Sequence, residues 1–292
     1  MRALAASCTR VGAWRIWTLG TAAPAAAEIV AALERLPLDA SLHRSKHADT
    51  YRWTRPGGDV YVKLYHRYRR WTAFKDWFRP SKAANVRAAS AALAAAGFVV
   101  PTVVALGEER RGAFGWSRSF CATAALAGEP IAARLAALAA PGEATARSAK
   151  RGLLATVGRE VARLHEAGVV AGDLVPANVW LALADAELRV AFLDHDRTRV
   201  GSRPAPWARA RRNLVQLNRI VLSGVTTTDR LRVYRAYAAA RGWTRDDARR
   251  RLPWIVAKTL ARRRAERGAR IPATADFRTV MRAGGPYGGG RA

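Results

Sequence analysis

The chain has 292 residues, which is long enough for a sizeable core and for either one large domain or two lobes. Half of the residues are apolar and ten are tryptophan, a composition that excludes an intrinsically disordered chain. The 50 basic and 22 acidic residues give a net charge of +28, which attracts nucleic acid, anionic membrane surfaces or phosphorylated glycolipids. The two cysteines, Cys8 and Cys121, are far apart and lack metal-site spacing, so the sequence indicates neither a zinc site nor a disulfide framework.

Residues 1–37 are interpreted as an N-terminal extension. Arg10 and Arg15 interrupt its apolar runs before they reach the length of a signal-peptide core. No stretch of the sequence approaches the roughly 18 apolar residues of a membrane-spanning helix. We therefore expect a cytoplasmic protein whose membrane contact, if any, is peripheral.

An extended pattern runs from residue 38 to residue 66. The segments TYRWT and VYVKLYH flank the turn sequence RPGGD at residues 55–59, which predicts a β-hairpin with Lys63 in its second strand. Residues 81–96 are rich in helix-forming residues and precede Gly97, so they predict a helix with a glycine at its end.

Two β-type runs follow, at residues 98–106 and 115–126, before the sequence AGEP at 127–130 breaks the pattern. Apolar residues at helical spacing predict a helix over residues 148–167. A loop with short flanking strands comes next, and residues 207–270 read as helical, with a strongly basic section.

Three polar residues in the loop and after the next strand carry the chemistry. Asp173 and Asn178 are five positions apart in GDLVPAN, behind the helical sequence EVARLHEAG, and Asp194 follows Asp173 by twenty-one residues. Protein kinases use this arrangement to orient the acceptor hydroxyl through the first aspartate and to hold Mg²⁺ through the asparagine and the later aspartate. Lys63, in an earlier strand, stands where kinases carry the lysine that binds the nucleotide phosphates.

These motifs, YVKLYHR, LHEAGVVAGDLVPANVWL, FLDHDRTRV and WARARRNLVQLNR, resemble the lipopolysaccharide core kinases, the family that includes 3-deoxy-D-manno-octulosonic acid (Kdo) kinase and heptose kinases. The resemblance covers roughly residues 38–223. It implies an α+β, two-lobed protein-kinase-like fold, with a small antiparallel sheet plus one helix at 38–125 and a mainly helical lobe at 126–283. The glycine-rich composition of residues 284–292 predicts a flexible tail.

The resemblance also implies an ATP- and Mg²⁺-dependent phosphotransferase with an alcohol group as acceptor. The acceptor would be a Kdo or heptose of anionic, lipid-linked core oligosaccharide at the cytoplasmic face of the inner membrane. We expect a monomer with peripheral contact to anionic inner-membrane lipids and no nucleic-acid partner.

The implied site consists of one catalytic residue, two metal ligands and a set of nucleotide contacts. They are Asp173 as the catalytic residue, Asn178 and Asp194 as metal ligands, and Lys63, Asn85, Ser45, Lys46, Thr123, Ala124 and Leu126 as nucleotide-binding residues.

The sequence departs from the kinase pattern in three places. Ala171 stands where the catalytic loop normally has a histidine. The predicted helix has no glutamate to pair with Lys63, although Asn85 lies near that position and could hydrogen-bond the lysine. The phosphate loop at residues 44–50 contains no glycine. Asp196 is expected to pair with a neighbouring arginine, or else to serve as a second metal or substrate group.

Because of these departures, two other hypotheses about the function stay open. One is a kinase-like protein that phosphorylates another protein or a small molecule such as an aminoglycoside. The second is a catalytically impaired pseudokinase that binds anionic glycolipid through its basic surface.

Overall fold

The computed structural model describes residues 6–20, 23–35, 41–45, 47–66, 80–110, 116–139, 144–184, 186–222, 224–265 and 277. These residues form two compact units. The first unit comprises the chain up to residue 126 together with residues 195–197, and the second comprises residues 127–194 and the chain from residue 198 onward. Within the described residues, no helix combines the length and the apolar character needed to cross a membrane.

The first unit is built on one antiparallel sheet of seven strands, in the order β1-β2-β6-β7-β5-β4-β3. The strands are β1 (Ala6–Val11), β2 (Trp14–Leu19), β3 (His43–Arg44), β4 (Ala48–Trp53), β5 (Val60–His66), β6 (Val103–Glu109) and β7 (Arg118–Ala124). The predicted hairpin is confirmed as β4 and β5, in which Trp53 pairs with Val60. The segment interpreted as an N-terminal extension supplies β1 and β2, and β2 pairs with β6 inside the same sheet.

Strand β6 begins later than the predicted run at residues 98–106 because Pro101 has no backbone N–H to donate to a ladder. The predicted helix at 81–96 is confirmed as α3 (Lys82–Ala95). The hydroxyl of Ser81 accepts a hydrogen bond from the Ala84 N–H and so caps its first turn. Gly97 follows the helix with a φ of 75°, a conformation that glycine adopts without a Cβ penalty.

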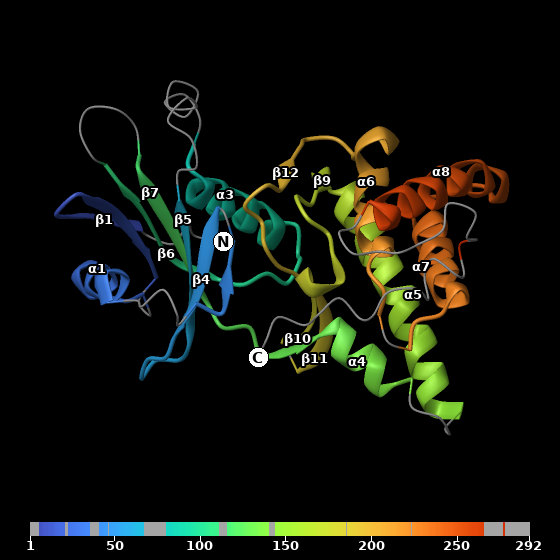
Figure 1. Cartoon of the computed structure of the whole chain (residues 1–292), viewed down its shortest axis with the longest axis horizontal. Helices are drawn as coiled ribbons and strands as arrows, with labels where there is room; N and C mark the ends of the chain where they lie inside the picture. Colours follow the sequence, from blue (N-terminus) through green and yellow to red (C-terminus); the bar gives the residue numbers. More distant parts are fainter. Residues whose placement is uncertain are drawn as a thin grey trace. The chain divides into compact units, whose positions relative to one another are not determined.

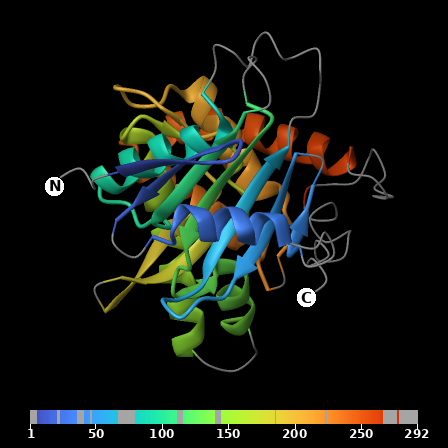
Figure 2. The same cartoon turned by 90° about the vertical axis from the view of Figure 1, so that its left-hand side faces the viewer.

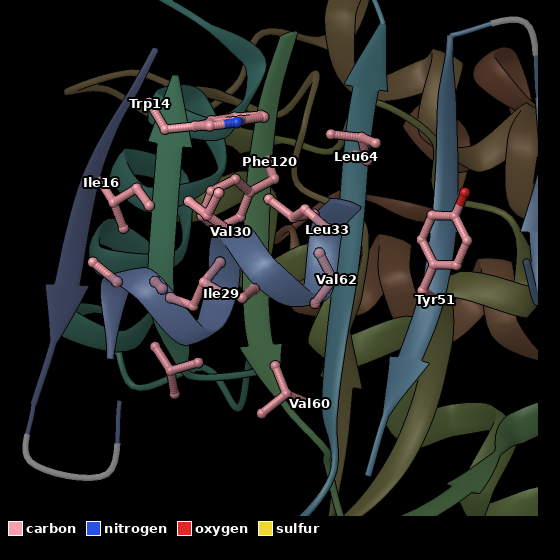
Figure 3. Packing of buried hydrophobic residues seen from close by; sticks show 14 residues of the cluster. Trp14, Ile16, Ile29, Val30, Leu33, Tyr51, Val60, Val62, Leu64 and Phe120 are labelled. Atoms are coloured by element: carbon pink, nitrogen blue, oxygen red, sulfur yellow. The ribbon is translucent and has the colours of Figure 1, made fainter. Parts of the chain in front are cut away.

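Helices α1 (Ala26–Arg35) and α3 lie against opposite faces of the sheet (Figure 1). Figure 2 shows α1 lying across the strands. Its buried side chains Ile29, Val30 and Leu33 pack with sheet residues such as Phe120 (Figure 3). On the other face, α3 contributes Ala83 and Val86 to a second cluster with Tyr65, Leu106 and Cys121.

The second unit is mainly helical. Its helices are α4 (Ile131–Ala137), α5 (Ala144–Glu166), α6 (Trp207–Arg219), α7 (Thr227–Ala240) and α8 (Arg245–Arg264). The predicted helix at 148–167 is confirmed as α5, which packs along α7. Gly158 allows this approach, because a Cβ at this position would lie 2.3 Å from the Val233 carbonyl oxygen.

Short strands of the second unit frame the loop that carries the kinase-like motif. They are β8 (Gly128–Pro130), β9 (Val169–Val170), β10 (Val179–Ala184), β11 (Glu187–Phe192) and β12 (Arg199–Val200), with a 3₁₀ turn, η3 (Pro176–Asn178), before β10. Strand β10 lies between β11 and β8, and β9 pairs with β12. The loop from residue 171 to residue 175 is thus anchored by paired strands at both ends.

Candidate active site

The β10–β11 hairpin brings Asn178 and Asp194 to the same end of one small sheet. Val179 pairs with Phe192 in the antiparallel register, so the residues just outside that pair lie side by side. The Leu193 N–H donates to the Asn178 carbonyl oxygen at 2.9 Å, which continues the pairing by one step. The sequence spacing between the two predicted metal ligands is therefore the length of a hairpin.

The side chains of these two residues match the chemistry of a hard cation. Asn178 Nδ2 donates to the Asp173 carbonyl oxygen at 2.9 Å, which orients the amide and leaves Oδ1 as the atom that could contact a cation. Asp194 has a φ of 59°, in the left-handed region that aspartate tolerates better than most residues. An amide oxygen and a carboxylate are oxygen donors of the kind that Mg²⁺ prefers. Among the described residues, no three His, Cys, Asp or Glu side chains cluster as an alternative metal site.

The Asp173 carboxylate is held in place by a side chain from helix α6. Gln216 Nε2 donates to Asp173 Oδ1 at 3.1 Å and to the Gly172 carbonyl oxygen at 3.2 Å. Its Oε1 accepts from the Leu174 N–H at 3.2 Å. Gln216 therefore bonds the residue before Asp173, the carboxylate itself and the residue after it.

Asn213, one helical turn before Gln216, holds the loop at Ala171. Its Nδ2 donates to the Ala171 carbonyl oxygen at 2.8 Å and to Gln216 Oε1 at 2.7 Å, while its Oδ1 accepts from the Ala171 N–H at 3.0 Å. The Asn213 side chain is completely buried. The main chain that lacks the usual histidine is thus clamped from both its donor and its acceptor side.

The His165 side chain is hydrogen-bonded to Asn213. Because Asn213 Oδ1 is an acceptor, His165 Nε2 carries the proton of the 3.1 Å hydrogen bond, and Nδ1 accepts from the Tyr237 hydroxyl at 2.9 Å. Burial lowers the pKa of His165 to about 4, with Arg241 adding to that effect and the hydrogen bond to Asn213 opposing it. His165 is therefore neutral near pH 7, and we name His165, Asn213, Gln216 and Tyr237 the loop-support network.

Lys63, in the first unit, lies in the middle of β5, between Thr50 of β4 and Cys121 of β7. Alternation along the strand puts its side chain on the α3 face with Tyr65, and its Nζ lies 5.6 Å from the Tyr65 ring centroid. Nζ is also 3.8 Å from Asp196 Oδ2. The expectation that Asp196 pairs with a neighbouring arginine missed this contact with Lys63.

The Asn85 side chain, from helix α3, contacts the main chain at His195 and Asp196. Its Nδ2 donates to the carbonyl oxygens of His195, at 3.2 Å, and of Asp196, at 2.9 Å. These two bonds connect Asn85 to the main chain that carries Asp196, and the suggested hydrogen bond from Asn85 to Lys63 stays a prediction.

The predicted nucleotide contacts are partly explained by local structure. The Ser45 hydroxyl donates to the Ala48 carbonyl oxygen at 2.9 Å and accepts from the Ala48 N–H at 3.1 Å, so it closes the turn between β3 and β4. Lys46 lies outside the described residues. Thr123 and Ala124 belong to the end of β7, and the Ala124 N–H donates to the Thr102 carbonyl oxygen at 2.9 Å. Leu126 follows that strand.

The residues that sequence reasoning missed are Gln216 as a partner of Asp173 and Asp196 as a partner of Lys63. The role of Gln216 could have been predicted from the sequence. Asn213 and Gln216 are three positions apart, so they share one face of an otherwise apolar helical stripe. Two buried amides on such a face require hydrogen-bond partners.

The chain matches one protein-family model and many solved structures. The model of the lipopolysaccharide kinase (Kdo/WaaP) family matches residues 41–237. A solved structure described as WaaP in complex with acyl carrier protein matches with a TM-score of 0.56 and 24% sequence identity, over 75% of this chain and 86% of that chain. No curated protein matches the chain by sequence.

Proposed function

Because the chain belongs to the lipopolysaccharide kinase (Kdo/WaaP) family, we propose that it transfers the γ-phosphate of ATP to a hydroxyl of a Kdo or heptose residue in the lipopolysaccharide inner core. The observation that carries the proposal is the arrangement of Asp173, Asn178 and Asp194 around one loop and one hairpin, with the main-chain bond between Leu193 and Asn178.

In this proposal Asp173 receives and orients the acceptor hydroxyl. The hydrogen bond from Gln216 fixes Oδ1, so the carboxylate keeps one orientation and Oδ2 can take the proton from the sugar hydroxyl. Phosphoryl transfer relies mostly on positioning and charge neutralisation. A carboxylate held between two bonded main-chain groups meets the positioning requirement.

Asn178 Oδ1 and the Asp194 carboxylate would hold Mg²⁺, which when bound would neutralise charge on the phosphates of ATP. Lys63 would contact the same phosphates. Ser45 and Lys46 would lie near the phosphates, and Thr123, Ala124 and Leu126 near the adenine, as the kinase pattern implies. The two-lobed kinase layout, with lobes at 38–125 and 126–283, is part of the proposal.

The net charge supports an anionic acceptor. A chain of +28 attracts core oligosaccharide, whose carboxylates and phosphates bind arginine well. The same field would bring the protein to anionic lipids at the cytoplasmic face of the inner membrane.

The test is phosphorylation of defined acceptors by the purified full chain. We expect Kdo-lipid A or a heptosylated core to gain the mass of one phosphate in the presence of ATP and Mg²⁺. Asp173→Asn and Asp194→Asn should each lower the rate by about 100-fold or more. Asp246→Asn, on an exposed surface of α8, is the matched control and should keep the wild-type rate.

The outcomes also separate the alternatives. Labelling of an aminoglycoside or a protein, with both core acceptors unmodified, would place the chain among kinases with other substrates. ATP binding without turnover on any acceptor would favour a pseudokinase. Mass spectrometry of lipopolysaccharide from a deletion strain would then identify the sugar, because the core should lack one phosphate.

A further inference from the structure

Helix α3 lacks the acidic residue that kinases use beside the phosphate-binding lysine. Its sequence, KAANVRAASAALAA, contains neither aspartate nor glutamate. In protein kinases a glutamate of the corresponding helix pairs with the strand lysine and keeps its ammonium group directed at the nucleotide. The question is therefore which group orients Lys63.

Asp196 occupies the position of a partner for Lys63. Its Oδ2 lies 3.8 Å from Lys63 Nζ, and the two side chains are 12% and 25% exposed, respectively. Partial burial reduces solvent screening, so this pair is held more strongly than an ion pair on an open surface.

Asn85 connects this pair to α3. One amide nitrogen bonds two consecutive carbonyl oxygens, those of His195 and Asp196, so the main chain is fixed at the residue that bears the carboxylate. The His195 side chain is buried as well. The helix thus holds a carboxylate that its own sequence does not supply.

We propose that Asp196 is the positioning residue for Lys63, in place of a helix glutamate, and that Asn85 positions Asp196. This inference rests on the proposed function, in which Lys63 binds the phosphates of ATP. Asp196 lies two residues after Asp194, so one short segment supplies both a metal ligand and the lysine's partner. The glutamate that α3 lacks is then replaced by a carboxylate from another segment of the chain.

A double-mutant cycle tests the proposal, with the full chain and a non-hydrolysable ATP analogue plus Mg²⁺ followed by calorimetry. Asp196→Asn should weaken analogue binding by about tenfold, and so should Lys63→Ala. The double variant should bind no more weakly than Lys63→Ala, because the two residues act through one contact. Asp196→Glu should stay within about threefold of wild type, since it keeps the charge.

Asp59→Asn is the matched control, because Asp59 pairs with Arg52 on the same sheet at a more exposed site, and it should bind like wild type. Asn85→Ala should weaken binding in the same direction as Asp196→Asn, by about threefold. If Asp196→Asn unfolds, the comparison of Asp196→Glu with Asn85→Ala still decides the question.

Additive losses in the cycle, or unchanged binding by Asp196→Asn, would overturn the proposal. So would a change confined to the Mg²⁺ concentration dependence, which would make Asp196 a metal ligand. Absence of analogue binding by the wild-type chain would overturn it together with the kinase assignment. Analogue binding with the expected cycle, but no phosphorylated core acceptor, would refute only the proposed function.

Discussion

Replacing Asn213 with alanine removes four hydrogen bonds from the interior of the second unit, those to His165, to Gln216 and to both main-chain groups of Ala171. The bonds to His165 and Gln216 are fully buried. The orphaned His165 Nε2–H costs about 1–3 kcal/mol and the lost bond to Gln216 about 1 kcal/mol more. We expect a loss of about 3 kcal/mol in the free energy of unfolding, since water can reach the half-buried Ala171 groups.

This loss corresponds to a fall of about 6–12 °C in melting temperature for a unit of this size, measured by circular dichroism. Activity should fall further than stability explains, because a displacement of about 1 Å at Asp173 can cost about 100-fold in rate. The phosphorylation assay is run well below the melting temperature of the variant. Arg209→Ala, at an exposed position on the same helix, is the control. A variant that melts and turns over like Arg209→Ala would refute the role assigned to the loop-support network.

Three further predictions concern groups outside the reacting centre. The pKa of His165 is about 4 when folded and 6.5 ordinarily, so the unfolded chain binds the proton first. Urea titrations should therefore show stability falling by about 3 kcal/mol between pH 7 and pH 4, and His165→Gln should remove that part of the slope. Gly158→Ala should destabilise the protein by about 2 kcal/mol, because the added Cβ would meet the backbone of α7. Gly152→Ala, in open space on the same helix, is the control and should be neutral or stabilising. Equal unfolding curves for the two variants would contradict this prediction. Burial raises the pKa of Cys121 to about 12, so a thiol reagent at pH 8 should label the exposed Cys8 alone until the chain is unfolded, and rapid native labelling of both would show that this core opens.

Local chemistry made several elements predictable. The turn at residues 55–59 and the alternation around it specify a hairpin, and Ser81 with Gly97 marks the ends of α3. Asp173, Asn178 and Asp194 were identifiable because their spacing reflects one loop and one hairpin, which are short-range features.

The strands within residues 6–19 were harder to predict, because strand formation depends on the pairing partner as much as on the local sequence. Strand β2 pairs with β6, roughly ninety residues later, and no pattern within the N-terminal segment specifies that pairing. The phosphate-loop and adenine contacts stay predictions, since they depend on a nucleotide.

The sequence by itself determined the class of chemistry, through the residues of one loop and the strand that follows it. Tertiary structure decided what holds those residues. Gln216 reaches Asp173 across forty-three positions, and Asp196 reaches Lys63 across more than a hundred. Any nearby element can supply the side chain that bonds a site residue, provided that this side chain has a suitable donor or charge. The sequence position of such a partner residue therefore depends on how the folded chain packs and not on the motif.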